Sequence, residues 1–373
     1  MALSVGVIGG GQLARMMIVP AVSMGVELSV FAEAPGSSAR LAATVVGDYR
    51  NSDEVLAFAR TVDAVTFDHE HVPQSVLRQL IDEGVRVHPG PDALLFAQDK
   101  LEMRRRLTEL GVPVPVWAAV KDAAEVDAFL ADNGGVAVVK TPRGGYDGRG
   151  VRVVRAGHEV IDWFETPGVG FLLIEELVGF SRELSQMVAR SASGEVAVWP
   201  LVESVQRDGV CAEVIAPAPR SVGRVAEVAE QIARTVAEGV GVTGVLAVEL
   251  FETDDGRLLV NELAMRPHNT GHWTIEGAVT SQFEQHLRAV LDLPLGDPSA
   301  RQPWTVMSNI LGGPPHEDLT DRYPQMMSQF PAVKVHGYGK ETRPGRKVGH
   351  VTVSGTDLED VVVQARAATA VFD

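Results

Sequence analysis

The sequence predicts a chain of α/β and α+β domains, with a parallel sheet near the N-terminus and a β-rich remainder. Three observations support this fold class. Apolar, β-prone runs alternate with helical stretches over the first 110 residues, a Val-Pro-Val-Pro segment follows at 112–115, and short strands dominate after residue 116. Strands that alternate with helices are typical of a parallel sheet with helices on both faces.

The first region begins with an apolar run over residues 3–8, and a helical stretch starts at Gln12. Further β-like runs lie at 28–32, 64–67 and 85–88. One helix is expected from Asp92 to Leu110, ended by Gly111 and Pro113. Because the proline run at 112–115 is typical of a stiff, extended linker, the first domain is expected to end near residue 111.

The second region contains β-like runs at 136–140, 151–154, 171–178, 184–189 and 196–199, and then an amphipathic helix at 223–239. A hairpin is expected from strands at 245–251 and 258–261, because the Asp-Gly between them is a strong turn signal. After Pro303 β-like runs alternate with turns, and the chain ends in a helical stretch near 357–370.

Composition limits the class of protein. A chain of 373 residues is long enough for two or three domains. Its net charge of −16 argues against a nucleic-acid partner, which would need a basic face. Cys211 is the single cysteine, which excludes intramolecular disulfides and thiolate metal clusters. The N-terminus does not look like a signal peptide, and no long apolar run suggests a membrane span, so a cytoplasmic protein is expected.

The turn Gly9-Gly10-Gly11 lies between a strand and a helix and fits the dinucleotide fingerprint G-x-G-x-x-A, which ends at Ala14. Glycines let a phosphate approach the backbone, and the helix N-terminus attracts the anion. Glu33 lies at the distance expected of a ribose ligand. A phosphate site, a nicotinamide site and a tight turn without ligand are all compatible with this motif.

The segment KTPRGGYDGRG at 140–150 predicts a mobile loop that closes over phosphates through its backbone N–H groups. Lys140 ends a strand and supplies a fixed positive charge, and Arg143 and Arg149 add two more. The alternative is a glycine-rich hairpin turn with a solvated lysine. The segment is not a Walker loop, because no Gly-Lys-Ser/Thr opens a helix.

Glu249 and Glu262 lie on the two strands of the expected hairpin. With a two-residue loop at 254–255, Glu249 faces Val260, and side-chain alternation places Glu262 on the same face as a diagonal neighbour. Two carboxylates at that spacing can hold Mg²⁺. Asn261 would then point away, unless the strand ends or bulges there. The alternative is a salt-bridged pair on a solvated face, which the apolar flanks disfavour.

The hairpin leads into the most polar loop of the chain, which carries Arg266, His268, Asn269 and His272. Arginine offers a fork that suits a carboxylate or a phosphate. The alternative is a loop that braces its own backbone, and His272 fits that role as well as it fits a ligand. Trp273 is expected in the core.

Two further segments suggest anion or substrate contacts. RPGRKVGH at 343–350, with Lys340 before it, gathers basic residues in an acidic chain and indicates an anion site, with a solvated basic turn as the alternative. Phe67 to His71 closes the third strand, where open α/β sheets bind ligands. Glu70 is the residue there expected to contact substrate, although it could instead cap a helix.

Together Lys100, the Gly-rich loop, Glu175-Glu176, Glu183, Glu249 and Asn261-Glu262 resemble the ATP-grasp superfamily. More narrowly, GGGQLARM, GGYDGRG, NELAMRPHNTGHWT and RPGRKVGH resemble the ATP-dependent carboxyaminoimidazole ribonucleotide synthase family, from residue 5 to about 355.

The resemblance implies an ATP-grasp fold. A Rossmann-like pre-ATP-grasp domain would span 1–111. The ATP-grasp domain would span 112–300, with a small lid lobe at about 116–178 and a large lobe at about 179–300. A small β-rich C-terminal domain would span 301–373. The resemblance also implies a homodimer. The implied reaction uses ATP, with Mg²⁺ or Mn²⁺, to phosphorylate bicarbonate, and the exocyclic amine of 5-aminoimidazole ribonucleotide then takes up the carboxylate.

Residue roles follow from the same resemblance. The ATP-binding set would be Lys100, Lys140, Gly145, Tyr146, Asp147, Gly148, Arg149, Gly150, Val151, Glu175, Glu176, Leu177, Val178, Glu183, Gln206, Asn261 and Glu262. Glu249 and Glu262 would bind the metal, and Arg266, His268, Tyr146 and Asp147 would form the catalytic set. The ribonucleotide and bicarbonate would also meet Gly11, Gln12, Leu13, Glu70, His71, Asn269, Lys340 and Arg346.

The chain departs from the family pattern at Met265, where proline is usual, at Ala14, where glycine is frequent, and at Asp68, where glutamate is expected. Gln206 stands where some relatives have histidine. Competing interpretations are a formate-using glycinamide ribonucleotide transformylase, a nicotinamide-dependent dehydrogenase and a non-catalytic nucleotide sensor.

Overall fold

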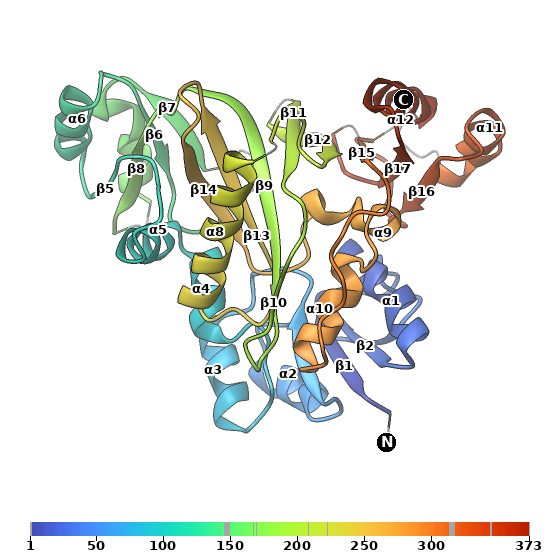
Figure 1. Ribbon diagram of the computed structural model, residues 1–373. Coiled ribbons are helices and arrows are strands. Elements are labelled where there is room, and N and C mark those ends of the chain that lie inside the picture. Colours follow the sequence, from blue (N-terminus) through green and yellow to red (C-terminus); the bar gives the residue numbers. More distant parts are fainter. Residues whose placement is uncertain are drawn as a thin grey trace.

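The structure is a computed structural model that describes residues 2–144, 150–166, 168, 170–207, 209–221, 223–312, 318–343 and 345–372. Its strands form three sheets, and the small sheet with α6 stands apart from the rest (Figure 1). Within the described residues, no helix is long and apolar enough to cross a membrane.

The N-terminal sheet is parallel, as predicted. Its strands are β1 (Ser4–Ile8), β2 (Glu27–Ala32), β3 (Ala43–Val46) and β4 (Ala64–Phe67), in the order β3-β2-β1-β4. Helices cover both faces. α1 (Gln12–Met24) and the later α10 (Gln282–Val290) share one apolar core, and α2 (Ser52–Ala59) and α3 (Gln74–Asp82) contribute to the other.

One expectation for this domain was wrong, and one strand was missed. Residues 85–88 do not form a full strand, because only the bridge between Val65 and Val87 connects them to β4. Strand β3 was not predicted, since all four of its residues are exposed and the run lacks the alternation of a half-buried strand.

The single helix expected over 92–110 is two helices, α4 (Pro91–Gln98) and α5 (Lys100–Glu109). The chain breaks at Asp99, whose carboxylate accepts the backbone N–H groups of Leu101 and Glu102. Such a side-chain cap competes with continued helix and begins a new one. Gly111 has φ of +68° beyond α5, so the left-handed cap predicted there is confirmed.

The small lobe follows residues 112–116, which form neither helix nor strand. Its antiparallel sheet has the order β5-β8-β6-β7 and contains β5 (Trp117–Val120), β6 (Ala137–Lys140), β7 (Val151–Val154) and β8 (Leu172–Glu176). The helical elements α6 (Ala123–Asp132), η1 (Gly157–Val160) and α7 (Ile161–Phe164) accompany it. Lys140 therefore ends a strand, as predicted.

The large lobe is built on a nine-stranded antiparallel sheet in the order β14-β13-β9-β11-β12-β15-β17-β16, with β10 paired to β9. Its first six strands are β9 (Phe180–Arg190), β10 (Val196–Val198), β11 (Val202–Arg207), β12 (Val210–Ala216), β13 (Gly244–Thr253) and β14 (Leu258–Ala264). α8 (Arg224–Gly239) packs its apolar residues into the core below β9 and β13.

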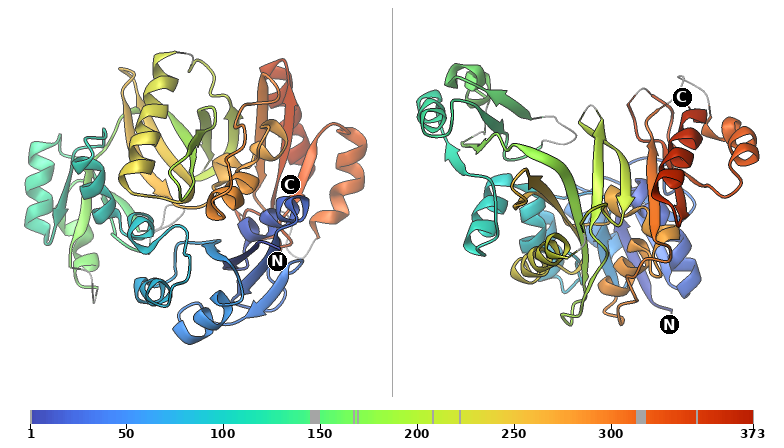
Figure 2. Two further views of the ribbon diagram at one scale, coloured as in Figure 1. Left: turned by 60° about the horizontal axis from the view of Figure 1, so that its bottom comes forward. Right: turned by 45° about the horizontal axis from the view of Figure 1, so that its top comes forward.

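The C-terminal strands continue this sheet rather than forming a separate one. They are β15 (Trp304–Ile310), β16 (Lys334–Gly337) and β17 (Gly349–Gly355), and β15 pairs with β12. Both views in Figure 2 show these orange and red strands beside the green strands of the large lobe. The remaining elements are η2 (Asn269–Gly271), α9 (Thr274–Gly277), η3 (Leu319–Arg322), α11 (Tyr323–Gln329), α12 (Leu358–Thr369) and η4 (Ala370–Phe372).

Candidate active site

Two adjoining cavities lie where the domains meet. The first, of about 530 Å³, lies between the small lobe and the central sheet and is here called the lobe cavity. The second, of about 810 Å³, lies between the N-terminal domain and the central sheet and is called the domain cavity. Four side chains line both: Lys100, Glu249, Glu262 and His268. A group bound in one cavity can therefore reach a group bound in the other.

The hairpin of β13 and β14 places the two glutamates at this junction, but with a register that differs from the prediction. The turn is one residue longer than expected, so Leu250 pairs with Val260. A β-bulge then follows, and Glu249 pairs directly with Glu262. A bulge sets two residues of one strand opposite one of the other and re-aims their side chains. Asn261 consequently lines the lobe cavity together with Glu262 instead of pointing away.

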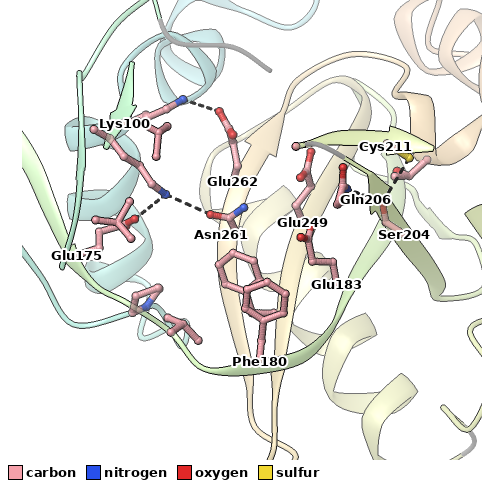
Figure 3. A pocket seen from close by; sticks show the side chains of 18 of the residues that line it. Lys100, Glu175, Phe180, Glu183, Ser204, Gln206, Cys211, Glu249, Asn261 and Glu262 are labelled. Carbon is pink, nitrogen blue, oxygen red and sulfur yellow. Dashed lines mark hydrogen bonds and ion pairs between the residues drawn. The ribbon is translucent and has the colours of Figure 1, made fainter. Parts of the chain in front are cut away.

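Two lysines from other parts of the chain contact these side chains, and Figure 3 shows Lys100 beside Glu262. Lys100 Nζ lies 2.6 Å from Glu262 Oε1. Lys140 Nζ lies 2.6 Å from Glu175 Oε2 and donates to Asn261 Oδ1 at 3.3 Å. Lys100 lies at this position because Asp99 caps the N-terminus of α5, so that the helix begins at residue 100. The cluster thus has fixed positive charge on one side of the cavity and carboxylates on the other.

Glu175 belongs to a buried ion cluster. Its carboxylate accepts from Arg104, which is fully buried and also donates to the backbone oxygen of Asn261 at 2.7 Å. Burial opposes ionisation of Glu175, but the charges of Arg104 and Lys140 outweigh it and lower the pKa of this carboxyl. Glu175 therefore anchors Lys140 between the small lobe and β14.

Glu249 is in the opposite situation. Burial, with the carboxylates of Glu262 and Glu183 nearby, raises the pKa of Glu249 above its usual range. Facing carboxylates in a partly dry cavity favour a bound cation, which would compensate their charge. Among the residues that the structure describes, no three His, Cys, Asp or Glu side chains converge as a ready metal site. Glu249 and Glu262 are a pair, and Mg²⁺ is commonly held by one or two carboxylates plus the phosphates of a substrate.

Part of the lining of the lobe cavity is apolar. Phe180 and Phe251 stack with ring centroids 4.5 Å apart, and Val138, Val151 and Leu177 also line the cavity. Glu183 and Gln206 line the same cavity; Gln206 donates to Ser204 at 2.9 Å, and burial raises the pKa of Glu183. Figure 3 shows Glu183 and Glu249 on neighbouring strands, facing the same space.

In the domain cavity, Arg266 Nε donates to Glu70 Oε2 at 2.7 Å. Gln98 holds the loop that carries Glu70 by donating to the backbone oxygens of Glu70 and Val72 at 2.8 and 2.7 Å. On the far wall, Lys340 donates to Gln12 Oε1 and so connects the C-terminal region to the N-terminal domain. Polar side chains from three parts of the chain thus converge on one cavity.

Asp68 occupies the N-terminus of α1, where its Oδ1 accepts the N–H of Ala14 at 2.8 Å. A Cβ added at Gly11 would lie 2.0 Å from the other carboxylate oxygen, so glycine is needed there. Glu33, a candidate ribose ligand, instead accepts from the Gly10 N–H at 3.3 Å and lies 2.9 Å from His69 Nε2. Both carboxylates crowd the turn, which disfavours a nicotinamide dinucleotide.

Family models match three successive parts of the chain. Residues 1–98 match the ribonucleotide synthetase preATP-grasp domain, and residues 105–283 match the ATP-grasp domain. Residues 305–364 match the phosphoribosylaminoimidazole carboxylase C-terminal domain.

Relatives are similar over nearly the whole chain. N5-carboxyaminoimidazole ribonucleotide synthase of Mycobacterium tuberculosis is 50% identical over 371 residues, which cover 98% of this chain and 86% of the relative. The chain belongs to the N5-carboxyaminoimidazole ribonucleotide synthase family. The Synechococcus elongatus member is 39% identical, over 98% of this chain and 93% of the relative.

Solved structures of the family agree with this fold. The Aspergillus clavatus synthase in complex with ADP and 5-aminoimidazole ribonucleotide superposes with a TM-score of 0.88 at 30% identity, over 100% of this chain and 99% of the other. The same enzyme complexed with ATP gives a TM-score of 0.90 at 31% identity, over 100% and 98%. The predicted ATP-grasp fold with its preATP-grasp domain is therefore confirmed.

Most residues predicted from the synthase family resemblance lie at the two cavities. The lobe cavity is lined by Lys100, Lys140, Val151, Glu175, Glu176, Leu177, Val178, Glu183, Gln206, Asn261 and Glu262. The domain cavity is lined by Gln12, Leu13, Glu70, His71, Lys340, Arg266 and His268.

Other predicted residues have different positions. Asn269, expected among the substrate contacts, lines the lobe cavity and not the domain cavity. Gly11, Gly150 and Arg346 line neither cavity, and Arg346 instead donates to the backbone oxygen of Glu341 at 3.3 Å. The predicted residues Gly145, Tyr146, Asp147, Gly148 and Arg149 lie outside the described part of the chain.

The structure shows the surroundings of two residues whose roles the sequence left open, His272 and Met265. It also shows two residues near the site that the sequence analysis did not name, Lys347 and Arg104. His272 is a buried bracing residue, and Met265 is fully buried in the main apolar core. Lys347 lines the lobe cavity, and the basic segment 343–350 was the available signal for it. The sequence did not indicate a role for Arg104, because three successive arginines in a predicted helix are typical of a solvent-exposed helix face.

Proposed function

We propose that this chain carboxylates the exocyclic amine of 5-aminoimidazole ribonucleotide with ATP and bicarbonate, and that the product is carboxyaminoimidazole ribonucleotide for purine biosynthesis. The observation that carries the proposal is the junction lined by Lys100, Glu249, Glu262 and His268, where the two cavities meet. A reactive group formed from ATP in the lobe cavity could be used in the domain cavity without leaving the protein. Family membership supports this assignment.

In the lobe cavity, the apolar side chains that include Phe180 and Phe251 would contact the adenine, and Lys100 and Lys140 would neutralise phosphate charge. Phosphoryl transfer depends on positioning and charge neutralisation more than on covalent help. Mg²⁺, or Mn²⁺ in its place, would be held by Glu249 and Glu262 and would neutralise charge on the transferred group. Lys100 and Glu262, now paired with each other, would each exchange that partner for the ligand.

In the chemical step that we propose, a bicarbonate oxygen attacks the γ-phosphorus, and ADP leaves with the electrons of the broken P–O bond. The amine then attacks the carboxyl carbon of carboxyphosphate, phosphate leaves, and the amine loses a proton. Carboxyphosphate is short-lived in water, so transfer across an enclosed junction protects it. Arg266, with its planar fork, suits the bicarbonate or the developing carboxylate.

His268 has a defined role at the junction. Its Nδ1 accepts the N–H of Thr270 at 3.4 Å and contacts Thr270 Oγ1 at 2.9 Å. That arrangement leaves the proton on Nε2, which lies 3.2 Å from Glu249 Oε1. Burial lowers the pKa of His268, so the ring is neutral and donates to Glu249. The released phosphate is then the better acceptor for the proton of the amine.

The test is ATP hydrolysis measured with 5-aminoimidazole ribonucleotide, with glycinamide ribonucleotide plus formate, and with neither. We expect stimulation only by the first, and loss of that stimulation when bicarbonate or divalent metal is omitted. Stimulation by glycinamide ribonucleotide and formate would identify the transformylase instead. Absence of any stimulation would contradict the assignment as a whole.

We also propose that the chain forms a homodimer. The N-terminal domain exposes apolar side chains that a monomer leaves in water: Val19 is 72% exposed, Val22 74% and Leu41 70%. Val19 and Val22 lie one turn apart on α1, so they share one face of that helix. Light scattering should give twice the 39.9 kDa mass of the chain. Replacing Val22 with Glu should give the monomer, and a monomeric unmodified protein would contradict the proposal.

A further inference from the structure

We propose that Gln282 is a positioning residue that holds His268 at the junction of the two cavities; the proposal rests on the function proposed above. Gln282 begins α10 and is fully buried. Its Oε1 accepts the backbone N–H of His268 at 2.8 Å, and its Nε2 donates to the backbone oxygen of His268 at 2.9 Å. One side-chain amide thus satisfies both backbone groups of the residue at the junction.

These two hydrogen bonds take the place of the backbone hydrogen bonds that a neighbouring strand would make. β14 ends at Ala264, and η2 begins at Asn269, so His268 lies in irregular backbone between them. Backbone groups that are buried outside regular structure need a partner, because an unpaired one costs free energy. The Gln282 amide is the partner of the His268 N–H and shares the His268 oxygen with the N–H of Gly271, which donates to it at 3.0 Å. The amide therefore contacts the backbone of His268 at both of its polar groups.

Gln282 is itself held in place. Its backbone N–H donates to Thr274 Oγ1 at 2.9 Å, and its Nε2 lies 2.8 Å from His272 Nδ1. Burial lowers the pKa of His272 well below its usual value, so this ring is neutral and accepts from the amide. A Cβ at Gly271 would lie 2.4 Å from Gln282 Oε1, so the loop also fits closely around the amide.

The helix that carries Gln282 contacts both walls of the domain cavity. His286, one turn further along α10, lies 2.7 Å from Thr66 Oγ1 of β4 and accepts the N–H of Val245 of β13 at 3.0 Å. β4 leads to Glu70 and β13 leads to Glu249. Gln282 therefore sets the position of His268 relative to both the N-terminal domain and the carboxylate pair.

The same helix offers a matched control. Gln285 is also fully buried, and its amide forms the same two-bond pairing with Gly296, at 2.7 Å from the Gly296 N–H and 2.8 Å to its oxygen. Neither Gln282 nor Gln285 lines either cavity. Gln282→Met and Gln285→Met thus break equivalent buried interactions, and only the first of these pairings holds His268.

We expect Gln282→Met to lower kcat with 5-aminoimidazole ribonucleotide by about 100-fold, because His268 contacts Glu249 and a misplacement of about 1 Å at a reaction site has effects of that size. The KM for ATP should change by less than about threefold, since Gln282 acts on His268 and not on the lysines and aromatic rings proposed to hold ATP. Gln282→Glu keeps the acceptor but loses the donor, so its kcat should be intermediate. Gln285→Met should keep kcat near that of the unmodified enzyme, although both methionine variants lower thermal stability similarly.

Equal kcat losses in Gln282→Met and Gln285→Met would overturn the proposal, as would a Gln282→Met enzyme with nearly unchanged kcat. Failure of the proposed function has a different signature, in which the unmodified enzyme does not respond to the ribonucleotide. Crystal structures of the two methionine variants decide the positioning role in either case. The proposal expects His268 Nε2 to leave Glu249 in the Gln282 variant alone, and an unmoved His268 there would overturn it.

Discussion

Replacing Glu262 with Gln is expected to reduce ribonucleotide-dependent ATP turnover by about 1,000-fold, the upper range for losing one preorganised charge contact in an active site. Glu262 lines both cavities, pairs with Lys100 at 2.6 Å and lies directly opposite Glu249. An amide keeps the shape of the side chain but offers a cation no negative charge. Steady-state turnover over a range of Mg²⁺ concentrations measures the effect, and higher Mg²⁺ should recover part of it.

Asp254→Asn is the matched control, because it removes one carboxylate from the exposed turn of the same hairpin. This variant should keep full turnover and an unchanged Mg²⁺ dependence. The Glu262 variant should unfold within a few degrees of the unmodified protein, since a partly exposed carboxylate contributes little to stability. Turnover of Glu262→Gln within a few-fold of the unmodified enzyme would refute the metal role of this glutamate.

Replacing Arg266 with Met should lower kcat/KM for 5-aminoimidazole ribonucleotide by about 100-fold or more, while the KM for ATP stays nearly constant. This difference between the two substrates is expected from the position of Arg266. Arg266 lines the domain cavity and not the lobe cavity, and its guanidinium is oriented there by Glu70 at 2.7 Å. Loss of the fork removes a donor from the substrate and leaves Glu70 without its cation. Initial rates at varied ribonucleotide and at varied ATP separate the two effects.

Arg266→Lys should recover only part of the activity, because an ammonium keeps the charge but not the planar pair of donors. A surface pair provides the control: Arg78 lies 2.7 Å from Asp92 in the N-terminal domain, and both side chains are largely exposed. Arg78→Met should leave both KM values and kcat unchanged. A rise in the KM for ATP equal to that for the ribonucleotide would contradict the separation of the two cavities.

Local sequence patterns predicted much of the site. Alternation and turn residues placed Glu249 and Glu262 as diagonal neighbours on one face of a hairpin. In the structure the two residues pair directly, and both line the lobe cavity. The end of a strand at Lys140 and the capped end of α5 at Gly111 were also predicted. These features depend on residues close in the chain, where side-chain periodicity and backbone preference act directly.

The register of the hairpin was wrong for a physical reason. Alternation specifies which face of the hairpin a side chain takes. It does not distinguish a two-residue loop from a three-residue loop, and it does not reveal a bulge, although each of these changes which residues pair. The bulge that re-aims Asn261 is stabilised by contacts from outside the hairpin, since Arg104 and Lys140 both bind Asn261. Similarly, the break at Asp99 replaced one predicted helix with two because a side-chain cap outweighed the continuing helical periodicity.

The sequence by itself determined the order of the domains, the family and many of the polar residues that line the two cavities, because those are read from local pattern and from motif resemblance. Only the tertiary structure decided how they meet. Lys100 and Glu262 are 162 residues apart, Lys340 and Gln12 are 328 apart, and the amide of Gln282 reaches back to His268 across a loop. Such contacts follow from how sheets and helices pack in three dimensions, and no periodicity within one segment encodes its partner in another.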